Sequence, residues 1–341
     1  MHPVRLAVAA LFLASTLAAA LIDRPATDEA TPALTTTMVP ETTTSTVAPP
    51  VTEPPPTTTT VVPVPTTAVA RGPAKVVVSP TGVVLPVTGR EGGAYRVATP
   101  CGKSAVVQQA TPVDGVVVLD AGHGGVEPGA VGPNGLTERA LNLAVTNHAK
   151  AALERAGIGV VLTRAGDYRM TIGARAAVVK AVAPKAFVSI HHNAEPDGPR
   201  PEGPGSETYY QTASADSKRL SGLLYEEIVK ALSAYQVAWV ADRDAGAKYR
   251  TNDRGDDYYG IIRTTKGTPS ALAELAFISN PAEEALLARP DVQQVEGEAV
   301  ARGIVRYLTT KDEGSGFTTP YPRNSPAGSG GGADNCLDPP L

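Results

Sequence analysis

Two histidines and two glutamates in this 341-residue sequence have the residue types and the surroundings of a catalytic site. His123 follows a short apolar run and lies in a glycine-rich turn, and His191 ends a second apolar run. Glu138 precedes a helical pattern, and Glu274 lies inside a third apolar run. Catalytic zinc takes three nitrogen or oxygen ligands and leaves a fourth position for water. These residues therefore predict a zinc hydrolase.

Strands and helices must bring these side chains together. Short apolar runs bounded by glycine are typical of buried parallel strands, and in open α/β sheets ligands bind beyond the carboxyl ends of such strands. The alternation of strand and helix patterns predicts an α/β fold with an open, mostly parallel, twisted sheet and helices on both faces. The predicted strands are 116–120, 159–163, 186–191, 207–210 and 270–277, and the predicted helices are 139–156, 171–182, 214–235, 282–288 and 292–307.

Four segments resemble, in family order, the zinc-dependent N-acetylmuramoyl-L-alanine amidases of the amidase 3 family. They are LDAGHGGVEPGAVG, GLTERALNLAVTNHAKAALERAGIGVVLTR, FVSIHHNA and PSALAELAFISNPAEEALL. The resemblance covers roughly residues 115–308. Two positions depart from the family pattern, because Arg139 stands where lysine is usual and His192 stands where a small residue is common.

The resemblance implies that His123, Glu138 and His191 bind one Zn²⁺ per chain. Side chains alternate along a strand, so His191 and His192 point to opposite faces, and the family pattern selects His191. Glu274 is the expected general base for water, because burial in an apolar strand raises the pKa of a carboxyl group. The alternatives are a histidine that only caps a turn and, for Glu138, a carboxylate that only interacts with the helix dipole.

The implied substrate is peptidoglycan or a muropeptide. The bond cleaved joins the lactyl group of N-acetylmuramic acid to L-alanine of the stem peptide. Stem peptides carry carboxylates, which arginine binds through two parallel hydrogen bonds, so Arg254 and Arg263 are predicted to bind substrate. Asn193, after the second histidine motif, is predicted to orient substrate or a ligand. The alternatives are an exported zinc carboxypeptidase or endopeptidase acting on stem peptides and a catalytically silent cell-wall-binding protein.

The N-terminal part of the chain has the composition of an exported protein. Residues 1–20 have a basic start, an apolar run and an A-x-A-like end, which is typical of a secretory signal peptide. Residues 21–72 are rich in Thr and Pro and have few large apolar groups, so a disordered linker is predicted. We therefore expect the protein in the periplasm, the cell wall or the extracellular space, with no stable membrane insertion after cleavage.

Segments on both sides of the catalytic domain, predicted at 113–310, complete the chain. Residues 73–112 alternate β-rich runs with turns, and so short a unit is expected to pack against the catalytic domain, with wall binding as the alternative. Residues 311–341 are rich in Gly, Ser and Pro and are predicted to form a flexible tail. The two cysteines, Cys101 and Cys336, are expected to form a disulfide in an exported chain.

Composition disfavours other classes of function. A net charge of −4 and an aromatic content of 5% argue against nucleic-acid binding. The sequence has no Walker motif and no dinucleotide-binding glycine pattern. Nothing in it requires more than a monomer. The residues between His191 and Glu274 are all taken up by predicted elements and loops, so we expect a site that is open without an activator.

Overall fold

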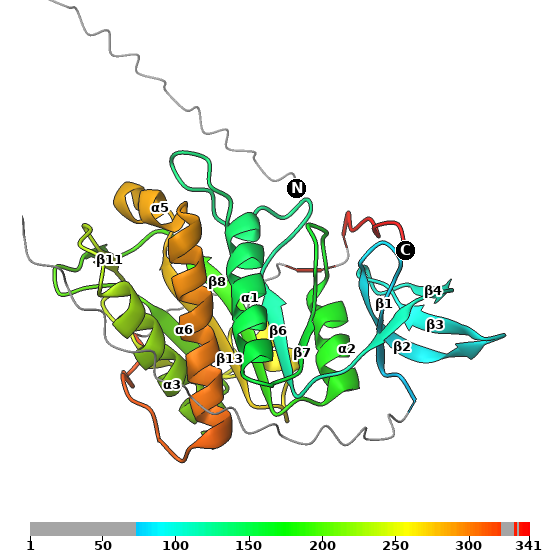
Figure 1. Cartoon of the computed structure of the whole chain (residues 1–341). Coiled ribbons are helices and arrows are strands. Elements are labelled where there is room, and N and C mark those ends of the chain that lie inside the picture. The colour runs from blue at the N-terminus through cyan, green and yellow to red at the C-terminus, as the bar shows by residue number, and fades with distance from the viewer. Residues whose placement is uncertain (1–72, 322–330, 333) are drawn as a thin grey trace, which may run out of the picture. The chain divides into compact units, whose positions relative to one another are not determined.

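The computed structural model describes residues 73–321, 331–332 and 334–341 (Figure 1). The predicted signal peptide and linker, residues 1–20 and 21–72, lie outside the described residues. Within the described part of the chain, no helix combines the length and the apolar character needed to cross a membrane.

A six-stranded sheet forms the centre of the α/β domain, in the order β12-β10-β13-β8-β6-β7. Neighbouring strands are parallel except for β10 and β13, which confirms the predicted mostly parallel sheet. The strands of this sheet are β6 (Val117–Ala121), β7 (Val160–Leu162), β8 (Ala186–Asn193), β10 (Glu207–Tyr210), β12 (Ala247–Lys248) and β13 (Ser270–Phe277). A separate pair, absent from the sequence prediction, consists of β9 (Gly198–Pro199) and β11 (Val240–Ala241).

Helices cover both faces of the sheet, as predicted. Because side chains alternate along each strand, Val188 and Ala273 face one core with α1, α3 and α6, which lie in front of the sheet in Figure 1. Phe187 and Leu272 face the opposite core, which contains residues of α2 and α4. The helices are α1 (Glu138–Arg155), α2 (Ile172–Val182), α3 (Ala215–Leu232), α4 (Gly260–Thr264), α5 (Pro281–Leu287) and α6 (Pro290–Thr309).

Local sequence signals explain where these helices begin and which face they bury. In α1 the apolar residues Leu141, Val145 and Ala149 recur at a spacing of four and are at most 1% exposed. At the start of α2, the Thr171 hydroxyl accepts a hydrogen bond from the Ala174 backbone N–H at 3.1 Å. Both helices begin within one residue of the prediction.

The β-rich unit is a five-stranded antiparallel sheet in the order β4-β3-β2-β1-β5. Val76 and Val84 share one hydrophobic core with Val118 and Val178 of the α/β domain. The unit also has a small core of its own, which includes Val77, Leu85 and Val97. It therefore packs against the α/β domain through one face, as expected for a sheet that can bury only a small core by itself. Its strands are β1 (Val76–Val78), β2 (Val84–Glu91), β3 (Ala94–Ala98), β4 (Ser104–Val107) and β5 (Thr111–Val113).

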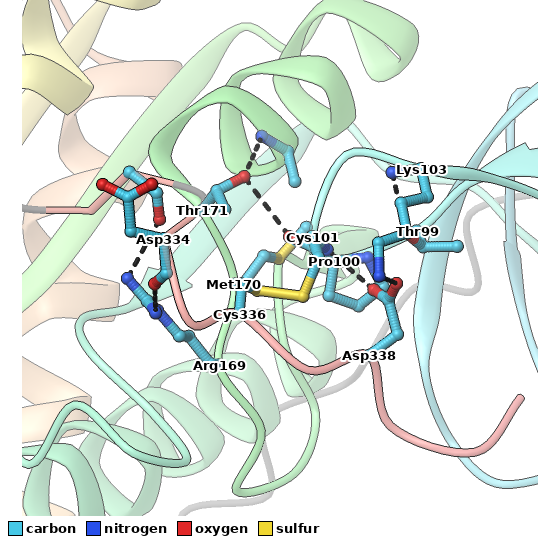
Figure 2. Close-up of a disulfide and its surroundings, with 12 residues drawn as sticks. Thr99, Pro100, Cys101, Lys103, Arg169, Met170, Thr171, Asp334, Cys336 and Asp338 are labelled. Carbon is cyan, nitrogen blue, oxygen red and sulfur yellow. Dashed lines mark hydrogen bonds and ion pairs between the residues drawn. A yellow bond between two sulfur atoms is a disulfide. The ribbon is translucent and has the colours of Figure 1, made fainter.

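The described part of the tail differs from the flexible segment predicted for residues 311–341. The Thr318 backbone N–H donates to the Ala247 carbonyl at 3.0 Å, so the tail extends the sheet beside β12. Cys336 is bonded to Cys101, which attaches the end of the chain to the β-rich unit (Figure 2). A segment with few apolar groups is held because an edge strand offers unpaired backbone groups and because the disulfide adds a covalent link.

Candidate metal centre

The ligand-type side chains predicted from the sequence lie together near the carboxyl ends of β6 and β8. His123 follows β6, His191 lies near the end of β8, and Glu138 is the first residue of α1. Their ligand atoms all lie within 4.8 Å of one another, so His123, Glu138 and His191 form a candidate metal-binding group. Glu138 lies between the two histidines, with Oε2 at 3.1 Å from His123 Nε2 and Oε1 at 2.8 Å from His191 Nδ1.

The environment favours the protonation states that bind a metal. Burial by itself would raise the pKa of Glu138, but hydrogen bonds with His123 and His191 hold this pKa well below the usual value. Burial lowers the pKa of His191. An ionised carboxylate and a neutral imidazole are the forms that bind a metal, because the ligand atom must carry a free lone pair.

Two glycines leave room for these side chains. A Cβ atom at Gly122 would lie 2.2 Å from Cε1 of His191. A Cβ atom at Gly129 would lie 2.4 Å from Oε2 of Glu138 and 2.7 Å from Cδ2 of His123. The glycine-rich turns of the first motif are therefore needed because any side chain there would occupy the space of the metal-binding group.

Two buried arginines hold the loop that carries His123. His123 has a φ of 60°, in the left-handed region that few residues adopt. Arg175 donates to the His123 carbonyl at 2.6 Å, and Arg164 donates to the Gly122 carbonyl at 3.0 Å. Both guanidinium groups also donate to the Ala121 carbonyl at 2.8 Å. These donors satisfy buried carbonyls that the turn leaves without backbone partners.

Asp120 balances part of this buried positive charge. It accepts hydrogen bonds from Arg175, Thr163 and Ser189, the last at 2.6 Å. Burial would raise the pKa of Asp120, but the charge of Arg175 and these hydrogen bonds lower it below its usual value. Burial and the neighbouring Arg175 lower the pKa of Arg164 to about 10. The His123 loop is therefore held by a buried hydrogen-bond network of the charged residues Asp120, Arg164 and Arg175.

A second buried network lies behind Glu138. Asn142 Nδ2 donates to Glu138 Oε1 at 3.1 Å, and Asn142 Oδ1 lies 2.8 Å from His192 Nδ1. On the other side of its ring, His192 Nε2 lies 3.4 Å from Oε1 of Glu296, and both side chains are fully buried. His192, which departs from the family pattern, thus lies outside the metal-binding group and orients Asn142 against Glu138.

Glu274 lies on the same face of the sheet as the metal-binding group. In the strand register it is paired with His191 on one side and with Glu207 on the other. Its Oε2 atom is buried and has no hydrogen-bond partner within the described residues. Burial raises the pKa of Glu274 well above its usual value, and the negative charges of Glu138, Glu207 and Asp242 raise it further.

Beside Glu274, Glu207 belongs to a network that the sequence analysis missed. Lys248 Nζ lies 2.5 Å from both Glu207 Oε1 and Asp244 Oδ1. The Tyr209 hydroxyl and the Asn193 amide both donate to Glu207 Oε2, at 2.7 and 2.9 Å. Glu207 therefore has a complete set of partners, unlike Glu274. Lys248 belongs to none of the recognised motifs, so sequence analysis had no signal for it.

The structure does not place the three predicted substrate-binding residues together. Arg254 is exposed on a turn, and Arg263 Nη1 donates to the backbone carbonyls of Asp257 and Tyr258 at 2.6 and 2.8 Å. Asn193 is the nearest of them in sequence to the metal-binding group, two residues after His191. The binding of substrate by these residues stays a prediction.

A cavity of about 420 Å³ adjoins the metal-binding group. This volume lies within the range of small-molecule sites. Its walls combine His123 and His191, apolar side chains from the α2 and α4 side of the sheet, and Gly331 of the described part of the C-terminal tail. The lining includes His123, His191, Met170, Ile172, Leu272 and Gly331.

A comparison with protein families identifies the relatives of this arrangement. The family model described as N-acetylmuramoyl-L-alanine amidase (Amidase_3) matches residues 117–306. The chain belongs to this family. The match contains all four residues of the predicted site, His123, Glu138, His191 and Glu274. The β-rich unit and the C-terminal tail of this amidase family member lie outside the match.

Individual relatives agree with this assignment. The chain is 36% identical to the uncharacterised protein YqiI of Bacillus subtilis strain 168 over 203 residues, which cover 59% of this chain and 88% of YqiI. It is 29% identical over 223 residues to the N-acetylmuramoyl-L-alanine amidase AmiC of Neisseria meningitidis serogroup B, and these cover 57% of this chain and 53% of AmiC. The chain thus spans about half the length of that amidase.

Among solved structures, Cwp6 from Clostridium difficile matches with a TM-score of 0.50 and 29% identity. The match covers 57% of this chain and 30% of Cwp6. Family membership and the similarity to the amidase AmiC support a peptidoglycan amidase function.

Proposed function

We propose that this chain hydrolyses the amide bond between the lactyl group of N-acetylmuramic acid and L-alanine of the stem peptide, with one Zn²⁺ held by His123, Glu138 and His191. The observation that carries the proposal is the position of Glu274 on the strand next to His191, with a buried Oε2 atom that has no hydrogen-bond partner among the described residues. A group left unpaired in this way costs stability in a purely structural strand, so a catalytic role accounts for it.

The donor set fits zinc. Two imidazole nitrogens and one carboxylate, all within 4.8 Å of one another, are the kind of ligands that catalytic zinc takes. The lowered pKa of Glu138 and of His191 keeps both side chains in ligating form. Zinc bound there supplies Lewis acidity, which lowers the pKa of water and polarises the scissile carbonyl.

The residues of the chain supply the proton transfers. Glu274, when ionised, takes a proton from the attacking water and passes it to the leaving nitrogen of L-alanine. Its raised pKa suits both steps, because a carboxyl group of ordinary acidity would be a weaker base and would hold the proton less readily for delivery. The buried network of Arg164 and Arg175 keeps His123 in place during the reaction.

The biological setting follows from the substrate. A peptidoglycan hydrolase must meet the cell wall, so we place the chain in the periplasm, the cell wall or outside the cell, as its predicted signal peptide suggests. We propose that the protein acts as a monomer, with peptidoglycan or a muropeptide as its partner and without an activator. The side chain of His123 is 32% exposed, which makes the metal-binding group reachable from solvent.

The test is product analysis. The purified full chain is incubated with peptidoglycan, and the released products are identified by mass, with no addition, with a chelator, and after zinc is restored. Free stem peptide beginning at L-alanine, lost with the chelator and regained with zinc, would support the proposal. Cleavage inside the stem peptide would instead identify a carboxypeptidase or endopeptidase. Binding of peptidoglycan without any cleavage, at full zinc loading, would identify a silent wall-binding protein.

A further inference from the structure

The C-terminal tail contributes to the cavity beside the metal-binding group. Gly331 lines this cavity together with His123 and His191, although it lies well beyond residues 117–306 that match the family. Its carbonyl accepts a hydrogen bond from the Ile172 backbone N–H at 3.0 Å. A Cβ atom added to Gly331 would lie 2.6 Å from Cγ1 of Ile172, which also lines the cavity. The tail backbone is therefore packed tightly against one wall of the cavity.

The disulfide anchors this segment a few residues further along. Cys336 is bonded to Cys101 across 235 residues of sequence (Figure 2). The Asp338 carboxylate accepts a hydrogen bond from the Cys101 backbone N–H at 2.8 Å, and the Pro340 carbonyl accepts one from the Thr81 hydroxyl at 2.6 Å. The end of the chain is therefore attached to the β-rich unit by a covalent bond, by these hydrogen bonds and by an ion pair of 3.8 Å between Asp338 and Lys103.

Arg169 connects the same segment to the loop that carries His123. Its guanidinium group donates to the backbone carbonyls of Gly332, at 2.9 Å, and of Asp334. Figure 2 shows Arg169 pointing toward this part of the tail. The same guanidinium group forms an ion pair of 2.8 Å with Glu127, which also lines the cavity. The side chain of Arg169 is only 10% exposed.

The disulfide region also contacts the start of α2. The Thr171 backbone N–H donates to the carbonyl of Pro100, the residue before Cys101, at 3.0 Å. Met170 and Ile172, on either side of Thr171, line the cavity. The position of this wall thus depends on contacts from the β-rich unit and from the tail, both of which the disulfide joins.

We propose that Gly331 forms part of a substrate-binding wall of this cleft, and that the Cys101–Cys336 disulfide, further along the chain, holds it in the position that binds the stem peptide. This proposal rests on the proposed function for the identity of the substrate. Backbone that is held by the hydrogen bond from Ile172 and by the disulfide presents a preformed surface to an extended peptide, without the entropic cost of ordering a free chain end. The tail acts on binding and takes no part in the proton transfers.

A matched pair of glycine substitutions tests the wall itself. In Gly331→Ala the new methyl group meets Ile172, and alanine is strained at the backbone φ of 80°, so both effects move the segment. In Gly332→Ala the methyl group meets nothing within 4 Å and the backbone is not left-handed. With a soluble N-acetylmuramoyl peptide as substrate, we expect Gly331→Ala to raise KM about tenfold with kcat nearly unchanged, and Gly332→Ala to leave both unchanged. Equal KM values for the two variants would overturn the proposal, and so would a loss confined to kcat.

The second experiment tests the disulfide. A phosphine reductant breaks the sulfur–sulfur bond, leaves two thiols on the protein and is itself oxidised to a phosphine oxide with oxygen from water, without the zinc chelation that a dithiol would cause. At a temperature well below the melting transition, we expect reductant to raise the KM of the native protein and to have no effect on the double variant Cys101→Ser/Cys336→Ser, whose KM is already raised. A KM that is the same in the native protein and the double variant would contradict the role of the disulfide.

Failure of this inference can be separated from failure of the proposed function. The dissociation constant of the N-acetylmuramoyl peptide is measured by calorimetry on Glu274→Gln, with and without the additional change Gly331→Ala. Weaker binding with Gly331→Ala supports the wall even if the native protein cleaves another bond. Unchanged binding overturns the wall even if the native protein is an amidase.

Discussion

Glu138 and Glu274 are two glutamates at the same edge of one sheet, and the structure gives them opposite surroundings. Glu138 receives hydrogen bonds from His191, Asn142 and a backbone N–H, and its pKa is held well below the usual value. Glu274 lies on the next strand from His191 with one oxygen unpartnered, and its pKa is raised well above the usual value. The environment alone thus shifts the pKa values of two carboxyl groups in opposite directions, as the proposed roles of Glu138 as metal ligand and Glu274 as proton carrier require.

The two regions also differ in how they are supported. Behind Glu138 a buried network runs through Asn142 and His192 to Glu296. Beside Glu274, the polar groups of Lys248 and Tyr209 bind Glu207 instead. The negative charge of Glu207 raises the pKa of Glu274, but the donors that bind Glu207 do not bind Glu274. Hydrogen bonds therefore fix Glu138, which must stay ionised in its proposed role, whereas Oε2 of Glu274, which must gain and lose a proton in its proposed role, has no hydrogen bond.

The largest effect is expected from the substitution of the proton carrier. Glu274→Gln keeps the shape of the side chain but removes its basicity, so we expect kcat to fall roughly 10²- to 10⁴-fold. The zinc content, measured by atomic absorption, should stay at one per chain, because Glu274 is not among the ligands. Glu202→Gln, at an exposed position, serves as the control and should leave both values unchanged. Retained turnover in Glu274→Gln would assign the base to another group.

Removal of a buried guanidinium tests the support of the His123 loop. Arg175→Ala leaves Asp120 as a buried charge without its main partner and the His123 carbonyl without a donor. We expect a loss of about 3–5 kcal/mol in the free energy of unfolding, measured by urea denaturation. Arg289→Ala, which breaks an exposed ion pair with Asp291, should have little effect. Similar free energies of unfolding for the two variants would mean that the buried network of Asp120 and Arg175 does not stabilise the fold.

The hydrogen-bond network behind Glu138 should influence zinc affinity more than kcat. Asn142→Ala removes a hydrogen bond to the Glu138 carboxylate, so we expect zinc affinity to fall about ten- to a hundredfold. Competition with a chromophoric chelator measures this affinity. Asn147→Ala, at an exposed position of the same helix, is the matched control. Equal zinc affinity in the two variants would show that Asn142 only packs.

The smallest effect concerns the pH dependence of turnover. Glu274 acts as a base only when ionised, so kcat falls as the pH drops through its raised pKa. The charge of Glu207 is one cause of this raised value. Glu207→Gln removes that charge, so the pKa of Glu274 should decrease and the acid limb of the profile should move to lower pH. A shift to higher pH, or none, would show that Glu207 does not act on Glu274 through its charge.

Residues close to one another in sequence explain why much of the fold was predictable. Thr171 and Ser214 cap helices through contacts within three residues, and Leu141, Val145 and Ala149 repeat with the period of one helix face. Predicted strands such as 207–210 and 270–277 coincide with β10 and β13. The short strands β9, β11 and β12 were missed, because two-residue strands leave no pattern of alternation to detect.

The sequence by itself determined the parts of the site that carry recognisable motifs, namely the residue types at His123, Glu138, His191 and Glu274. Only the tertiary structure decided their surroundings, because Lys248, Arg175 and Glu296 reach the site through contacts far apart in the sequence. The tail makes the same point, since its composition predicts no core of its own. A disulfide across 235 residues and an open sheet edge hold the described residues of the tail, and neither contact can be seen in local sequence.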